Sequence, residues 1–123
     1  MADTIAGAER YFTEFLPRIH GQLLLEDLKT LSVCFEIAVS DGAGAPWRLV
    51  VEEGRLVQAG PDEPEPVCRF TLDAGTLLEV VAGHIAPQEA FFDMRIQLEG
   101  DIEMGLKLST VLAPFFQRFP YMP

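Results

Sequence analysis

A short run of strict alternation constrains the fold of this chain more than any other feature. Between Leu31 and Val39 every odd position carries a large apolar side chain, and every even position carries a small or polar one. Successive side chains of a β-strand point to opposite faces, so this run predicts a strand with one buried face. Two more strands are predicted after it. The alternating apolar residues Trp47, Leu49 and Val51 indicate the first, and the turn Glu53-Gly54 leads into the second, Arg55–Ala59. The three strands are expected to form an antiparallel meander.

The N-terminal segment has helical spacing instead. Apolar residues recur every three or four positions from Thr4 to Thr30, and Pro17 is expected to kink or break the helix. The part after the proline is predicted to be a second short helix, with the apolar positions Ile19, Leu23, Leu24 and Leu28.

The C-terminal half reads as strand, helix, helix, strand and helix. Its markers are the strand positions Cys68, Phe70 and Leu72, the cap Asp73, the staple residue Leu77, the helix end Gly83, the first-turn Pro87, the strand positions Ile96 and Leu98, and the cap Asp101. Pro114 is expected to bend or end the last helix. One apolar sheet face and several helices able to cover it predict a two-layer α+β domain.

Chain length, charge and composition argue against several classes of function. A chain of 123 residues fits one domain, and its net charge of −10 argues against a nucleic-acid partner and against docking on anionic lipid. No stretch is long and apolar enough for a membrane helix, and the N-terminus lacks the pattern of a secretion signal, so we expect a cytoplasmic protein. Cys34 and Cys68 show no metal-ligand spacing. Alternation places them on opposite sheet faces, which disfavours a disulfide if their strands are neighbours.

The sequence has few motifs that are typical of enzymes. No serine lies in a Gly-x-Ser-x-Gly motif, and His20 and His84 are far apart in the sequence without a metal-ligand motif. Asp101 and Glu103 open a predicted helix, where the helix dipole favours acidic residues. We therefore expect no catalytic residues, no metal and no cofactor.

Several segments, taken in order, resemble the sterol carrier protein-2 family. They are Phe35–Gly42, Trp47, Glu53-Gly54, Phe70–Asp73, Leu77-Leu78, Gly83, Ala90–Phe92, Arg95–Asp101 and Gly105–Leu108. The likeness runs from about Leu31 to about Leu112. The Phe91-Phe92 pair, Arg95 and Glu99-Gly100-Asp101 look closest to bacterial standalone members, which are similar to the accessory lipid-binding factors of ubiquinone biosynthesis.

The resemblance implies a fold and a binding function. The fold would be a five-stranded mixed, mostly antiparallel sheet with one face covered by about four to five helices that enclose an apolar tunnel. Residues 1–123 would form one domain, with N-terminal helices in 1–30, a core in 31–112 and an apolar tail in 113–123. The tunnel would carry a fatty acyl chain, a phospholipid, an isoprenoid quinone precursor or a sterol-like molecule. The residues expected to bind lipid are Phe35, Ile37, Phe70, Leu72, Leu78, Val81, Phe91, Phe92, Ile96, Leu98, Met104, Leu108, Leu112 and Phe115.

Two questions stay open at this point. The aromatic tail from Phe115 to Met122 either covers the mouth of the cavity as a lid or packs into the core. The chain either carries a lipid or serves as a scaffold that binds biosynthetic enzymes through its sheet face or its tail. Expected partners are a lipid, a biosynthetic enzyme and a transient membrane contact. Polar residues that could select a headgroup are Arg10, His84, Gln88 and Arg95.

Overall fold

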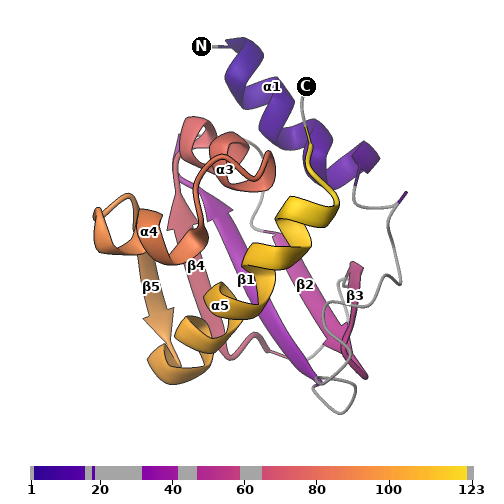
Figure 1. Cartoon of the computed structure of the whole chain (residues 1–123), viewed down its shortest axis with the longest axis vertical. Helices are drawn as coiled ribbons and strands as arrows, with labels where there is room; N and C mark the ends of the chain where they lie inside the picture. Colours follow the sequence, from indigo (N-terminus) through magenta and orange to yellow (C-terminus); the bar gives the residue numbers. More distant parts are fainter. Residues whose placement is uncertain (1, 16–17, 19–31, 42–46, 59–64, 122–123) are drawn as a thin grey trace.

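The computed structural model describes residues 2–15, 18, 32–41, 47–58 and 65–121 (Figure 1). The second N-terminal helix that we expect around residues 19–28, and Pro17 before it, lie outside these residues. The elements, in chain order, are α1 (Ala2–Arg10), the π-helical turn η1 (Tyr11–Phe15), β1 (Val33–Val39), β2 (Trp47–Glu52), β3 (Arg55–Gln58), β4 (Cys68–Leu72), α3 (Ala74–Val81), α4 (Pro87–Phe92), β5 (Ile96–Gly100) and α5 (Ile102–Arg118).

Within the described residues, five strands form one sheet in the order β3-β2-β1-β4-β5. β1 pairs antiparallel with β2, and β2 with β3, so the predicted meander is confirmed. β4 runs parallel to β1 and antiparallel to β5. The turn between β2 and β3 places Glu53 and Gly54 at positive φ, 53° and 77°, which suits a tight hairpin. The α+β class predicted from the sequence is confirmed.

The two faces of the sheet have different surroundings. In Figure 1 the helices α3, α4 and α5 lie over one face of β1, β4 and β5. The odd residues of β1 belong to the core on this side, and Phe35 is fully buried with Leu108 and Phe115 of α5. Glu36 faces the opposite side, where its carboxylate lies 3.1 Å from the Nε of Arg69 on β4. The alternation between Leu31 and Val39 therefore predicted both the strand and the face that the helices cover.

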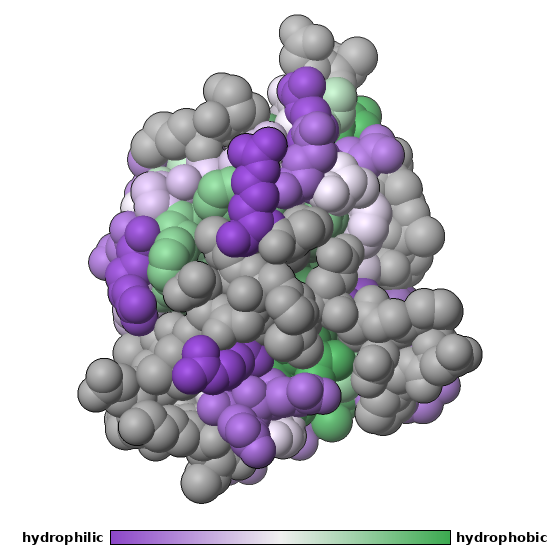
Figure 2. All heavy atoms as spheres, turned by 90° about the vertical axis from the view of Figure 1, so that its right-hand side faces the viewer, coloured by the Kyte–Doolittle hydropathy of each residue, from purple (hydrophilic) through white to green (hydrophobic). Residues whose placement is uncertain are grey.

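The remaining helix ends follow local chemistry. Asp73 and Asp101 are the residues before α3 and α5, as predicted, and the Asp101 carboxylate accepts a hydrogen bond from the Met104 N–H at 3.0 Å. Asp73 instead accepts a hydrogen bond from the Thr76 hydroxyl. Gly83 follows α3 with φ of 80°, and Pro87 opens α4. On the side of the molecule that Figure 2 shows, the described apolar side chains form separate patches among polar ones.

Pro114 does not end the last helix. α5 runs from Ile102 to Arg118 with Pro114 inside it, so of the two predicted effects, a bend or an end of the helix, the end is wrong. A proline inside a helix costs about 3 kcal/mol, whereas burying two phenylalanines contributes about 3 to 6 kcal/mol. Phe115 and Phe116, which follow the proline, are 0% and 7% exposed, so the turn that contains them remains helical.

Residues near the two ends of the chain pack against each other. The N–H of Tyr121 donates to the carbonyl of Val81 at 2.9 Å, and the Tyr121 ring lies 5.5 Å from the ring of Tyr11 and 5.0 Å from that of Phe15. Figure 1 shows this end beside α1. We call Tyr11, Phe12, Phe15 and Tyr121 the aromatic cluster.

Candidate functional site

The larger apolar cavity lies between the sheet and the helices and has a volume of about 40 Å³. Its floor comes from β1, β4 and β5, and its roof comes from α3, α4 and α5. The lining residues are Phe35, Ile37, Phe70, Leu72, Leu77, Val80, Pro87, Ile96, Ser109, Leu112 and Phe116. The serine has the one polar side chain in this set, and its hydroxyl donates to the carbonyl of Gly105 at 2.9 Å.

A second cavity, of about 10 Å³, shares lining residues with the first and is also lined by a residue of η1. It is lined by Tyr11, Phe35, Ile37, Leu49, Val81, Leu112 and Phe116. Four residues line both cavities: Phe35 and Ile37 from β1, and Leu112 and Phe116 from α5. The two cavities are therefore neighbours, with β1 and α5 contributing to the walls of both.

The volumes bear directly on the expected tunnel. Pockets that enclose a drug-sized ligand have volumes of about 300 to 1,000 Å³, and a single water needs about 10 to 15 Å³. The cavities of about 40 and 10 Å³ fall far below the first range. The structure thus has apolar voids at the expected place and no tunnel among its described residues.

Seven of the residues predicted to bind lipid line these cavities. They are Phe35, Ile37, Phe70, Leu72, Val81, Ile96 and Leu112. Strand alternation identified the first four and Ile96, because the apolar face of the sheet is also the floor of the larger cavity.

The other seven predicted residues do not line either cavity. Leu108 and Phe115 are fully buried in the core, and Leu78, Leu98 and Met104 pack against the edge of the core. Phe91 is half-buried, and Phe92 is 78% exposed, which corrects the expectation that this pair faces the interior together. Consecutive helical residues are about 100° apart, and in α4 the fully buried position belongs to Ala90.

Sequence reasoning missed Tyr11, Leu49, Leu77, Val80, Pro87, Ser109 and Phe116 as lining residues. Leu49 and Leu77 carried a signal, since alternation and the hydrophobic staple marked both as buried. No pattern marked Ser109, whose polar side chain argues against a wall position. Tyr11 and Phe116 lie near opposite ends of the chain, and a local sequence pattern does not show that these two segments pack beside each other.

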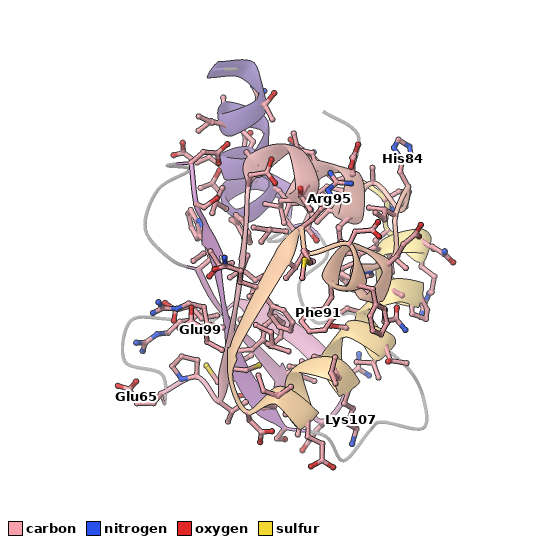
Figure 3. The ribbon with its side chains drawn as sticks, turned by 90° about the vertical axis from the view of Figure 1, so that its left-hand side faces the viewer. Glu65, His84, Phe91, Arg95, Glu99 and Lys107 are labelled. Carbon is pink, nitrogen blue, oxygen red and sulfur yellow. The ribbon has the colours of Figure 1, made fainter. Side chains whose placement is uncertain are left out.

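The polar residues considered for headgroup selection lie elsewhere. In Figure 3, His84 projects away from the body of the domain, and Arg95 lies at the start of β5. The Arg95 guanidinium lies 2.5 Å from the carboxylate of Glu79 and donates to the Thr76 hydroxyl at 3.2 Å. Gln88 donates to Thr110 at 3.4 Å, and Arg10 is exposed at the end of α1. None of the four lines either cavity.

Two buried groups have perturbed ionisation. Burial raises the pKa of the Tyr11 hydroxyl well above its ordinary value, and no described group forms a hydrogen bond with this hydroxyl. Burial, the nearby Asp101 carboxylate and Cys34 raise the pKa of the Cys68 thiol to about 11. Cys34 and Cys68 lie on the neighbouring strands β1 and β4, both are buried, and no disulfide joins them. A raised thiol pKa disfavours the nucleophilic thiolate at neutral pH.

Two further features of the described ranges concern metal binding and membrane spanning. Among those residues, no group of three or more His, Cys, Asp or Glu side chains is placed to hold a metal ion. None of the described helices combines the length and apolar character needed to cross a bilayer.

Comparison with known proteins places these features in a family. Rat sterol carrier protein 2 is 27% identical over 89 residues, which cover 70% of this chain and 16% of the rat protein. The chain therefore spans about one sixth of the length of this relative. The fold is similar to that of the UbiJ-SCP2 ubiquinone synthesis protein, with TM-score 0.58, 16% identity and 93% of each chain covered.

A second structural match is the sterol carrier protein-2 of Aedes aegypti in complex with palmitate. It has TM-score 0.53 and 13% identity, and the match covers 94% of this chain and 96% of that one. The sequence model of the SCP-2 sterol transfer family matches residues 12–113 of this chain. These residues include the strands, α3, α4 and most of α5. The chain belongs to the SCP-2 sterol transfer family.

Proposed function

We propose that this chain is a non-enzymatic carrier that takes up one long apolar molecule between its sheet and its helices. The observation that supports it best is the pair of adjoining cavities between β1 and α5, whose exposed inner surface is apolar throughout. The larger cavity, of about 40 Å³, exceeds the space that one water needs, and the smaller one shares four of its lining residues. The interior would open for a ligand at these cavities.

Uptake requires α5 or its side chains to move. Leu112 and Phe116 are the α5 residues that line both cavities, so their displacement from Phe35 and Ile37 joins the two spaces. Each buried methylene of a ligand contributes roughly 0.8 kcal/mol, so about ten methylenes contribute about 8 kcal/mol. That gain is large enough to offset the separation of a few apolar contacts.

The proposed ligand class is a fatty acyl chain, a phospholipid, an isoprenoid quinone precursor or a sterol-like molecule. The palmitate complex of the Aedes aegypti protein supports an alkyl chain, and the UbiJ-SCP2 protein supports an isoprenoid quinone precursor. The ligand would be transferred to a membrane or presented to a biosynthetic enzyme in the cytoplasm. We propose Phe35, Ile37, Phe70, Leu72, Val81, Ile96 and Leu112 as its first contacts. For Leu78, Phe91, Leu98, Met104, Leu108 and Phe115, contact with lipid stays a prediction.

The test is retention of 1-hexadecanol after gel filtration, quantified by gas chromatography. The wild-type chain should retain about one molecule per chain. Val80→Phe adds a ring at a buried residue that lines the larger cavity and should abolish retention. Val67→Phe makes the same change at a position that is 42% exposed and should leave retention unchanged. Lack of retention by the folded, delipidated wild-type chain would refute the carrier function.

A scaffold function has one observation in its favour. Phe92 and Met94 are 78% and 90% exposed, and exposed apolar side chains that lie close together mark protein interfaces. The tail is less suited to this role, because Phe115 and Phe116 are buried and Tyr121 packs in the aromatic cluster. A scaffold would bind its enzyme equally well after Val80→Phe and would lose the enzyme after Phe92→Ser. A carrier would lose lipid retention after Val80→Phe and would keep it after Phe92→Ser.

A further inference from the structure

Two apolar residues at the end of α4 are exposed, and one of them has an unusual backbone conformation. Phe92 and Met94 are 78% and 90% exposed, more than any other large apolar residue in the described part of the chain. Met94 has φ of 62°. Its N–H donates to the carbonyl of Phe91 at 3.0 Å, and the N–H of Arg95 donates to the carbonyl of Ala90 at 2.9 Å. These two bonds end α4 in a capping turn whose left-handed position is usually a glycine.

A methionine at this position does not stabilise the free domain. The left-handed conformation is unfavourable for a residue with a Cβ, whereas glycine adopts it without that penalty. Burial of the side chain does not offset the penalty, because Met94 is 90% exposed. Backbone strain is concentrated at functional sites, and exposed apolar side chains that lie close together mark interaction surfaces. Met94 has both features, so we expect it to meet an apolar surface that the free chain does not contain.

The turn that carries these residues connects two walls of the larger cavity. Pro87 at the start of α4 and Ile96 at the start of β5 both line that cavity. β5 is an edge strand of the described sheet, and in Figure 1 α4 and β5 lie together at the left side of the domain. A contact made by Phe92 and Met94 would therefore involve the segment that joins the roof of the proposed lipid site to its floor.

The size and the charge of this patch favour one kind of partner. A stable protein interface takes about 800 Å² from each partner, whereas two large side chains offer only about 300 to 500 Å². The surroundings are not positively charged, because Asp93 is exposed between the two apolar residues and the Arg95 guanidinium is paired with Glu79 at 2.5 Å. With a net charge of −10, the chain is repelled by anionic lipid. The surface of a zwitterionic bilayer takes up apolar side chains and requires no positive charge.

We propose that Phe92 and Met94 insert into the surface of a zwitterionic bilayer when the chain loads or delivers its lipid. This inference rests on the proposed carrier function and adds the place of membrane contact to it. The contact is transient, because two apolar side chains bury too little area for permanent attachment. It brings the turn between α4 and β5, which joins two walls of the larger cavity, to the source of the lipid.

The experiment measures co-sedimentation of the delipidated chain with sucrose-loaded phosphatidylcholine vesicles at millimolar lipid. The variants are Phe92→Ser, Met94→Gly and the two changes together. Each single change should weaken binding about tenfold, and the double variant should not bind above the background without vesicles. The control Ile102→Ser, at another apolar residue that is 46% exposed, should bind within about twofold of the wild type. Adding phosphatidylglycerol to the vesicles should not strengthen binding, and stronger binding would contradict the charge argument.

Urea unfolding distinguishes a contact residue from a structural one. Met94→Gly relieves the strain of the left-handed position, so the midpoint of unfolding should equal that of the wild type or lie higher. A clearly lower midpoint would show that the Met94 side chain stabilises the free domain, and this result would overturn the proposal.

Retention of 1-hexadecanol without vesicles tests the carrier function separately. The double variant should retain this probe as the wild type does, because neither Phe92 nor Met94 lines a cavity in the described interior. If the wild type retains the probe and the double variant binds vesicles equally well, the membrane contact is refuted while the carrier function stands. If the wild type retains no probe, the carrier function itself fails. If the wild type does not bind vesicles but binds a protein through Phe92 and Met94, the two residues form a protein interface and the proposal is wrong.

Discussion

Two leucines on the same helix give the sharpest test of how the interior is packed. Leu108 and Leu112 lie one turn apart on α5 and are 0% and 5% exposed. Leu112 lines both cavities, and Leu108 lines neither. The same substitution, leucine to alanine, therefore removes side chains that differ in how completely other atoms surround them.

The expected magnitudes follow from that difference. Leucine-to-alanine changes in a core cost about 2.7 to 5.0 kcal/mol, because transfer free energy and contacts with neighbouring atoms are both lost. A side chain that borders a void has fewer contacts to lose. We expect Leu108→Ala to cost about 4 to 5 kcal/mol and Leu112→Ala about 2 to 3 kcal/mol. Leu106→Ala, at a position 39% exposed on the same helix, should cost less than about 1 kcal/mol.

Urea unfolding followed by circular dichroism measures these free energies. If the free energy of unfolding of the wild type lies above about 7 kcal/mol, within the usual range of about 5 to 15 kcal/mol, all three variants remain folded in the absence of urea and can be compared. Delipidated protein must be used, since a bound lipid would stabilise the native state. If Leu112→Ala costs as much as Leu108→Ala or more, Leu112 is fully packed and the argument for two real voids is wrong.

Three further predictions concern the frame around the site. Gly100→Ala should cost about 3 kcal/mol or more in urea unfolding, because φ is 92° and the new Cβ would lie 2.6 Å from the carbonyl of Val67; Gly75→Ala, whose Cβ would meet no atom closer than 3.4 Å, should stabilise by about 0.5 to 1 kcal/mol. Asp101→Ala should cost about 1 kcal/mol by loss of the α5 cap, and Asp101→Asn should retain most of it, so equal losses would contradict the cap. The pKa of the Cys68 thiol is raised from 9.0 to about 11 in the folded chain. Between these pH values the unfolded chain loses the thiol proton while the folded chain keeps it, so the free energy of unfolding should fall as pH rises from 9.0 to 11. Cys68→Ala should lessen this fall, and an unchanged pH dependence would contradict the shift.

The strands were predictable because their signals are local. Alternation from Leu31 to Val39 fixed both the strand and its buried face, and Glu53-Gly54 fixed the hairpin. Asp73 and Asp101 marked the starts of α3 and α5, and of these two side chains that of Asp101 forms the capping hydrogen bond to the backbone. Five of the residues that line the larger cavity followed from the strand pattern alone: Phe35, Ile37, Phe70, Leu72 and Ile96.

The features that escaped prediction depend on distant parts of the chain. Pro114 stays inside α5 because Phe115 and Phe116 are buried, and a local rule for proline does not include that burial. The Phe91-Phe92 pair could not be divided into a half-buried and an exposed member without the orientation of α4. The contact of the Tyr11 ring with the Tyr121 ring joins residues near opposite ends of the chain, which no local pattern indicates. Cavity volume depends on the packing of all these elements together.

The central claim is that an alkyl chain enters the space between β1 and α5. It is tested most directly by isotope-filtered NMR of the uniformly ¹³C-labelled chain with unlabelled 1-hexadecanol, in which nuclear Overhauser effects report protons that lie close together. We predict effects from the ligand methylenes to the methyl groups of Ile37 and Leu112, which line both cavities. Effects confined to exposed side chains such as Met94, with none to Ile37 or Leu112, would contradict an internal site.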